Sequence, residues 1–290
     1  MFPLTKILLP VDFSERCLGA ARYAEALAAH FRAEITLLHV LEPIRYEFST
    51  LEFGGTVMND LVASRAAQAQ KQLDGLLEEE LEGVRVARVL LDGDPAQKIV
   101  EYAHHERMNL IALPTHGYGP FRRFILGSVT AKVLHDADCP VWTGVHLEQA
   151  PKVGAIAFRH IVCALDLGPQ SRKALASAAE MASEFKARLT LVHAYPCIES
   201  RPGEYFDHDL ETDLAKSARE ELEKLRDAAG AEAELEVGGG DAPQVVCRAA
   251  QAHNADLLVI GRGADAGILG RLTGRAYSII RQSPCPVVSV

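Results

Sequence analysis

The sequence predicts two Rossmann-like α/β domains in tandem, and three observations support this fold class. The chain has 290 residues, which at roughly 100–200 residues per domain suggests about two domains. Short apolar runs alternate with helical stripes, the pattern of a parallel sheet with helices on both faces. The second half of the chain repeats the first. We therefore expect two domains, each with a five-stranded, mostly parallel sheet that binds ligands at the carboxyl ends of its strands.

The internal repeat has a constant spacing at its start and a drifting spacing at its end. Asp12 and Asp166 lie 154 positions apart, whereas Cys139 and Cys285 lie 146 apart. This drift indicates loop deletions between two copies of one fold. We place domain 1 at 1–146, a linker at 147–158 and domain 2 at 159–290. The matched segments are 6–12 with 160–166, 33–39 with 187–193, Asp94-Pro95 with Ala242-Pro243, and 139–141 with 285–287.

Each element of the first copy follows from its local pattern. Lys6–Val11 is a continuous apolar run, typical of a strand buried on both faces. Ser14 then offers an N-cap for a helix. The helical stripe is Ala21, Ala24, Ala28 and Phe31, repeated as Leu175, Ala178, Ala182 and Phe185. The other predicted elements are the strand Glu34–Val40, a helix around Met58–Leu81, the strand Arg85–Leu91, a helix Pro95–Glu106, the strand Leu110–Leu113, a short helix from Ser128 and the strand Val141–Val145.

Composition excludes several classes of function. The net charge of −9 argues against coating nucleic acid or anionic membranes, because neutralising phosphates needs a cationic surface. The six cysteines include no C-x-x-C pair, so neither a disulfide framework nor a zinc ribbon is expected. The N-terminal apolar run is too short for a signal peptide, and no membrane span stands out. We therefore expect a cytoplasmic protein with neither nucleic acid nor membrane as partner.

Residues 113–130 form the most informative stretch, because they run from a strand end through a glycine-rich loop to a helix start. Gly117 would let the backbone approach a ligand closely. Gly127-Ser128 opens the helix, where free N–H groups and the helix dipole favour an anion. The hydroxyls of Ser128 and Thr130 can donate to phosphate oxygens. The stretch indicates a phosphate cradle without the Lys of a Walker loop, and a plain turn with a helix cap is the alternative.

The chain resembles a tandem universal stress protein over nearly its whole length, twice. ATP-binding members of that family carry G-x2-G-x9-G-[ST]; Gly117, Gly127 and Ser128 fit this motif, and Pro114 replaces its first glycine. The resemblance implies an adenine nucleotide alpha hydrolase-like fold that holds ATP, ADP or AMP, with or without Mg²⁺, in the first copy. The segments that carry it are Pro10-Val-Asp-Phe-Ser14, Thr36-Leu-Leu-His-Val40, Gly93-Asp-Pro95, Thr115-His-Gly117, Leu126-Gly-Ser-Val129 and Cys139-Pro-Val141.

The resemblance also implies roles for individual residues. Asp12 would meet the adenosine part, since a carboxylate can accept from a ribose hydroxyl or from the adenine amino group. Pro10, Val11 and Val40 would contact the adenine base through apolar surface and backbone hydrogen bonds. Pro114 removes one backbone N–H from the loop and fixes φ near −65°. The implied nucleotide site is completed by Leu113, Pro114, His116, Gly117, Gly127, Ser128, Val129 and Thr130.

The second copy departs further from the family motif. It reads Gly261-Arg-Gly-Ala264, then nine residues, then Gly274-Arg275, so Arg275 takes the place of the hydroxyl residue. Asp166 still ends the first strand. Arg275, helped by Arg262 and Arg271, could anchor a different anion, but a decayed site kept for pairing is the favoured interpretation. The candidate residues of this copy are Asp166, Gly261, Gly274 and Arg275.

Three functions remain open at this point. The first is a module that binds an adenine nucleotide and signals in a stress response with an unknown protein partner. The second is a slow ATPase at the same site, although no general base for water is evident. The third is an interaction protein without nucleotide. His39 and His193 are expected to be structural, hydrogen-bonded histidines. By the resemblance, the copies pair through their last strands as an internal pseudo-dimer, and two chains form a homodimer.

Overall fold

The computed structural model describes residues 4–15, 17–43, 55–115, 126–144, 153–196, 208–262 and 274–290. Its elements in chain order are β1 (Lys6–Pro10), α1 (Cys17–Phe31), β2 (Glu34–Leu41), α2 (Gly55–Asp74), β3 (Arg85–Asp92), α3 (Pro95–His105), β4 (Leu110–Ala112), α4 (Ser128–Asp136), β5 (Val141–Thr143), the 3₁₀ helix η2 (Val153–Ala155), β6 (His160–Ala164), α5 (Ser171–Phe185), β7 (Arg188–Tyr195), α6 (His208–Ala229), β8 (Glu234–Gly239), α7 (Ala242–Ala252), β9 (Leu257–Ile260), α8 (Gly274–Gln282) and β10 (Val287–Ser289).

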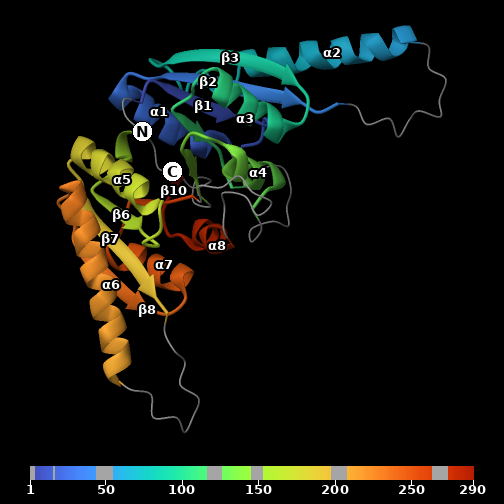
Figure 1. Ribbon diagram of the computed structural model, residues 1–290. Coiled ribbons are helices and arrows are strands. Elements are labelled where there is room, and N and C mark those ends of the chain that lie inside the picture. The colour runs from blue at the N-terminus through green and yellow to red at the C-terminus, as the bar shows by residue number, and fades with distance from the viewer. Residues whose placement is uncertain are drawn as a thin grey trace.

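All of these strands belong to one ten-stranded sheet in the order β3-β2-β1-β4-β5-β10-β9-β6-β7-β8. The first copy supplies β1–β5 and the second copy β6–β10, and within each copy every pair is parallel. One face of the sheet packs against α1, α2, α5 and α6, and the other against α3, α4, α7 and α8. Figure 1 shows the copies, blue to green and yellow to red, meeting near β10. The doubly wound α/β fold in two copies is thereby confirmed.

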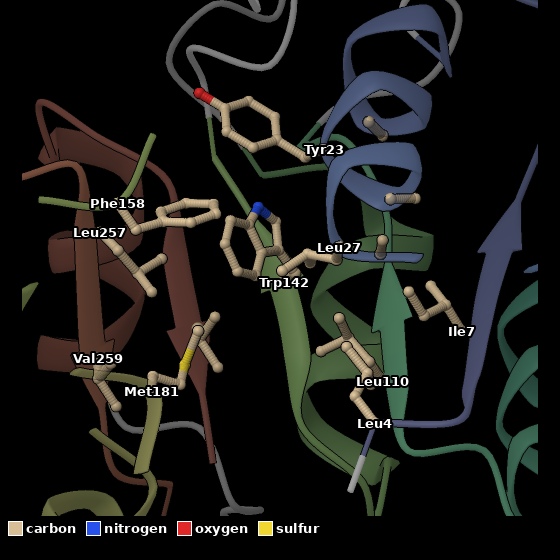
Figure 2. Close-up of a cluster of buried hydrophobic side chains, with 14 of the residues drawn as sticks. Leu4, Ile7, Tyr23, Leu27, Leu110, Trp142, Phe158, Met181, Leu257 and Val259 are labelled. Carbon is tan, nitrogen blue, oxygen red and sulfur yellow. The ribbon is translucent and has the colours of Figure 1, made fainter. Parts of the chain in front are cut away.

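The two copies join through their last strands. The pair β5–β10 is antiparallel, and Trp142 lies opposite Val288. These two residues hold equivalent positions in the two copies, so the register is symmetric about a pseudo-two-fold axis between them. The Trp142 ring is fully buried, and its centroid lies 5.7 Å from that of Tyr23 and 5.6 Å from that of Phe158. Figure 2 shows the tryptophan between these two rings. The predicted pairing of the copies within the chain is confirmed.

Helices α1 and α5 meet on the same pseudo-axis. The rings of Phe31 and Phe185, which occupy equivalent positions, are 5.7 Å apart and nearly perpendicular. His30 and Glu184 are also equivalent positions, and His30 Nε2 lies 3.0 Å from Glu184 Oε1. A pair of identical subunits would place two histidines or two glutamates there. The fused chain can instead put complementary groups on its axis, which favours pairing of unlike copies.

The structure corrects two local predictions. A third, the Ser14 N-cap, involves Arg16, which lies outside the described residues; the Ser14 hydroxyl donates to Asp12, and the described part of α1 begins at Cys17. The helix predicted around Met58–Leu81 ends at Asp74, and turns follow in which Leu77 takes a φ of 56°. Leu77 and Leu81 are buried although they lie in these turns, so the helical spacing of leucines in the sequence continues beyond the end of the helix.

The second correction concerns the match between Asp94-Pro95 and Ala242-Pro243. Asp94 and Asp241 are the N-caps of α3 and α7, with φ of −71° and −69° and the same ψ of 122°. Asp94 therefore corresponds to Asp241, one position earlier than the sequence suggested. No helix among the described residues is long and apolar enough to cross a membrane.

Candidate functional site

A pocket of about 460 Å³ lies where β1, β2 and β4 end and α4 begins. This volume is within the usual range of small-molecule sites. The structure brings together around it all the described first-copy candidates. They are Pro10, Val11, Asp12, Val40, Leu113, Pro114, Gly127, Ser128, Val129 and Thr130. The other two, His116 and Gly117, lie outside the described residues.

Asp12 is fixed by a tight turn at the end of β1. Its Oδ1 accepts hydrogen bonds from Ser14 N at 3.0 Å, Ser14 Oγ at 2.6 Å and Cys17 Sγ at 3.2 Å. Phe13 allows the turn by adopting a left-handed φ of 61°. Burial alone would raise the pKa of Asp12, but the hydrogen bonds from Ser14 and Cys17 together leave the pKa below its ordinary value. Asp12 is therefore an oriented carboxylate at neutral pH.

Cys17 supports Asp12 as a neutral thiol. Burial, followed by the neighbouring Asp12 charge, raises the pKa of Cys17 to about 12. The thiol therefore keeps its proton at neutral pH and can donate it to the carboxylate. Three donors converge on Oδ1 of Asp12, whereas Oδ2 has no hydrogen-bond partner in the described part of the chain. This second oxygen can accept from a ligand.

The ends of β1 and β2 place backbone groups at the pocket. Val11 N donates to Leu38 O at 2.9 Å, so Leu38 faces β1. Alternate residues of a strand direct their N–H and C=O groups to the same side. The backbone of Val40 therefore points past the end of β1 at Pro10, where the pocket lies. Its N–H and C=O can pair with a donor–acceptor edge of a ligand.

His39 helps to expose this strand end. Its Nδ1 lies 2.7 Å from Val11 O, where the next strand bond from Val40 would otherwise form. The ring also stacks on Phe13 at 4.1 Å between centroids. The same contact recurs in the second copy, where His193 Nδ1 lies 2.8 Å from Leu165 O. The expectation of hydrogen-bonded structural histidines is confirmed, and His39 additionally lines the pocket.

The opposite wall of the pocket is the N-terminus of α4. Gly127 is the N-cap, without a side-chain cap, and the first helical bond runs from Ala131 N to Gly127 O at 2.8 Å. The N–H groups of Ser128, Val129 and Thr130 precede that bond and have no carbonyl of the helix to pair with. Together with the helix dipole they favour an anion.

The hydroxyl of Thr130 does not have the expected role. Thr130 Oγ1 donates to Pro114 O at 2.9 Å, so its proton is not available to a phosphate as we predicted. This bond ties the start of α4 to the end of β4. The Ser128 hydroxyl is then the side-chain donor that remains at this helix start.

Several pocket residues escaped the sequence analysis. Pro95 and Ile99 come from α3, and Ile99 belongs to the buried stripe of that helix, which gave no hint of a ligand. Glu42 and Arg65 lie at the rim, and Arg65 Nη1 donates to Glu42 O at 2.8 Å. Arg65 is an ordinary exposed helix residue by sequence. Only the tertiary packing of α2 brings it to the pocket.

The second copy keeps the carboxylate turn after its first strand. Asp166 Oδ1 accepts from Gly168 N at 2.8 Å and from Ser171 Oγ at 2.9 Å, and Leu167 repeats the left-handed φ at 61°. The carboxylate turn therefore survives as a structural feature. Gly261 directly follows β9 and precedes Arg262.

The match of Gly274 with Gly127 needs correction. The buried residues of α4 are Thr130, Val133 and Leu134, and those of α8 are Ala276, Ile279 and Ile280, all 146 positions later. Gly274 therefore corresponds to Ser128, and Arg275 to Val129. The preceding strands are 147 positions apart, since Leu110 and Leu257 pair with equivalent residues of β1 and β6. The loop between strand and helix is one residue shorter in the second copy.

Arg262 is not an exposed anion anchor. Its side chain is 4% exposed and donates to backbone carbonyls of the first copy: Leu134 O at 3.1 Å, Ala137 O at 2.9 Å and Cys139 O at 2.6 Å. These contacts lie at the C-terminal end of α4. Arg262 therefore joins the two copies.

Comparison with known proteins identifies the family. The sequence model described as the universal stress protein family matches residues 3–143 and again 157–290. A universal stress protein of Methanocaldococcus jannaschii is 32% identical over 136 residues, covering 47% of this chain and 79% of the relative. One of Mycolicibacterium smegmatis is 26% identical over 291 residues, covering 98% and 96%.

Solved structures support the same fold over the whole chain. A universal stress protein from Archaeoglobus fulgidus aligns with a TM-score of 0.68 at 22% identity, covering 98% of this chain and 95% of that one. With the family model matched twice in succession and the repeat visible in one continuous sheet, this chain belongs to the universal stress protein family.

Proposed function

We propose that the first copy binds ATP or a related adenine nucleotide, and that the bound state acts as a signal to a partner protein in a stress response. The observation that carries this proposal is the pocket between the end of β2 and the start of α4. One wall offers a donor–acceptor pair and an apolar surface, and the other offers free N–H groups. An adenine base and a phosphate chain need these two surfaces at opposite ends of one site.

The adenosine end fits the β1 and β2 wall. Pro10, Val11 and Val40 supply apolar surface, and the backbone of Val40 can pair with the edge of the base. Asp12 Oδ2 can accept from a ribose hydroxyl. The phosphate end fits α4, where the N–H groups of residues 128–130 and the Ser128 hydroxyl meet the anion.

Binding rather than hydrolysis is the better-supported activity. The lowered pKa of Asp12 makes this carboxylate a weak base for activating water. Among the described residues, no group of three or more His, Cys, Asp or Glu side chains could hold a metal ion. A Mg²⁺ ion at this site would therefore arrive on the phosphates of the nucleotide, with few ligands from the protein.

The test is calorimetric titration of nucleotide-stripped protein with ATP, ADP and AMP, beside a Gly127→Val variant. Gly127 has φ −59° and ψ 146°, which any residue can adopt, so valine should fold but occupy ligand space. We expect at least about tenfold weaker binding, since charge-assisted bonds to the phosphates are lost.

The control is Gly274→Val, the same substitution at the first residue of α8 in the second copy. A side chain there meets nothing within 4 Å, so this variant should bind like the wild type. Wild-type protein that gives neither heat nor a thermal shift with any of the three nucleotides would contradict the proposed function. Full affinity in the Gly127 variant would contradict the assigned site.

A further inference from the structure

Two side chains of the second copy hold the two ends of α4. At the N-terminal end, Leu126 N donates to Tyr277 Oη at 3.1 Å. Leu126 is buried and directly precedes Gly127, the N-cap of α4. Tyr277 belongs to α8 and is separated from Leu126 by 151 positions in sequence. The residue that leads into the candidate phosphate site is thus anchored by the other copy.

At the C-terminal end of α4, the buried Arg262 side chain donates hydrogen bonds to three backbone carbonyl oxygens. Two of them, Leu134 O and Ala137 O, belong to the last turn and C-cap of α4, and the third is Cys139 O just beyond. The last carbonyls of a helix lack partners and carry partial negative charge. A planar guanidinium can donate to several of them at once, which a lysine cannot do in the same geometry.

The two residues that make these contacts have no like counterparts at the equivalent positions of the first copy. Under the spacing of 146 that relates α4 to α8, Tyr277 corresponds to Ala131, which has no hydroxyl. Under the spacing of 147 that relates β4 to β9, Arg262 corresponds to Thr115, which has no cation. Neither equivalent position in the first copy therefore carries the side chain that makes these contacts in the second. The copy with the degenerate motif supports the copy with the near-intact motif.

We infer that the second copy positions α4 for ligand binding in the first copy, with Tyr277 and Arg262 as positioning residues. The inference rests on the proposed nucleotide site at the start of α4. Helix N–H groups bind phosphate well only when a supporting shell holds them in the productive geometry. Tyr277 fixes the entry of the chain into α4, and Arg262 fixes the exit. Neither side chain is among the residues that line the pocket.

Such coupling must be reciprocal. If contacts with the second copy improve nucleotide affinity, bound nucleotide must strengthen those contacts by the same factor. Nucleotide in the first copy should therefore slow hydrogen exchange by local opening of backbone amides in α8, although no described residue of α8 lines the pocket. A hydroxyl with a purely structural role would not transmit this protection.

The first experiment compares Tyr277→Phe with wild type in the full-length chain, by ATP titration, thermal unfolding and amide hydrogen exchange. The variant removes one hydroxyl and keeps the ring. We expect ATP affinity about two- to tenfold weaker, the range that one neutral hydrogen bond spans. We also expect faster exchange at residues 126–131 without ligand, and weaker ATP-dependent protection of those α8 amides that exchange by local opening.

Ser278→Ala is the matched control. Ser278 is the next residue of α8, and its hydroxyl donates to Gly274 O within its own helix. Its removal should change neither affinity nor exchange in α4. Two substitutions of Arg262 test the C-terminal end of α4. Arg262→Lys should weaken ATP binding and Arg262→Met should weaken it more, because lysine keeps the charge but offers fewer directed donors, whereas methionine has neither.

The outcomes separate this inference from the proposed function. If the wild type binds none of ATP, ADP and AMP, the proposed function fails, while ligand-free exchange at residues 126–131 still tests the positioning. Faster exchange there in Tyr277→Phe, but not in Ser278→Ala, supports the inference. Tyr277→Phe with wild-type exchange at these residues overturns it, as does wild-type ATP affinity in that variant.

Discussion

Asp12 and Asp166 show how one residue type serves structure in both copies and a ligand site in only one. Both carboxylates hold the turn after the first strand with a backbone N–H and a side-chain hydroxyl. Asp12 is half-buried beside the pocket, whereas Asp166 is exposed. The shared role is therefore the turn, and the difference between the two sites lies in the opposite wall at α4 and α8.

We predict that Asp12→Asn and Asp166→Asn separate these roles. Asp12→Asn should lower the free energy of unfolding by about 1 kcal/mol, because charge-assisted hydrogen bonds become neutral ones. Asp166→Asn should cost less because the group is exposed. ATP affinity should fall in Asp12→Asn alone. Equal loss of affinity in both variants would refute the assignment of the site to the first copy.

The stability difference between wild type and Asp12→Asn should depend on pH. Because the folded pKa of Asp12 is lowered, its stabilising contribution is present above the unfolded value of about 3.9 and is lost as the pH falls through the lower folded pKa. The stability difference between wild type and Asp12→Asn should therefore shrink below about pH 4. Urea unfolding at a series of pH values measures it, and a difference that grows on acidification would contradict the lowered pKa.

Sequence located the strand-end residues of the site but not its tertiary members. Asp12 and Val40 end predicted strands, so the topology alone brought them to one edge. Arg65 comes from an exposed helix face and carried no local signal. Gly274 was matched with Gly127 instead of Ser128, because sequence alone does not show where in a loop a single residue is deleted. The buried residues of α8 show which residues of α4 they correspond to.

At the scale of elements, the strand and helix cores were predictable and their ends were less so. Continuous apolar runs fix a strand buried on both faces, which is why β1 and β2 begin where expected. The end of α2 was not predictable, because Leu77 and Leu81 keep a helical spacing through turns. A periodic pattern of apolar residues indicates which positions are buried, and here the buried positions continue past the end of the helix.

The junction of β5 with β10 gives the prediction at this scale. Trp142 is fully buried and packs between Tyr23 of α1 and Phe158, which lies two residues before β6 of the second copy. Trp142→Ala should lower the free energy of unfolding by about 3–5 kcal/mol, because the cavity spans the seam. Val288→Ala, directly opposite, removes two methyl groups and should cost clearly less. Chemical denaturation measures both, and similar losses would contradict the central place of the tryptophan.

At the scale of the whole molecule, the two copies share their cores. The cluster on one face of the sheet runs from Leu4 through Trp142 and Phe158 to Val290, and the cluster on the other face likewise contains residues of both copies. Since β5 and β10 are adjacent, neither copy can unfold without exposing apolar surface of the other. The two sequence repeats therefore pack around shared hydrophobic cores.

We therefore predict that the chain unfolds in one cooperative transition. Differential scanning calorimetry should give one peak of roughly 200 kcal/mol, from about 0.7 kcal/mol per residue, with equal calorimetric and van't Hoff enthalpies. Excess ATP, bound only in the first copy, should move the whole peak upwards, because ligand stabilises every part that unfolds with its site. Two peaks, of which ATP shifts only one, would show that the copies are independent and that the shared cores do not couple them.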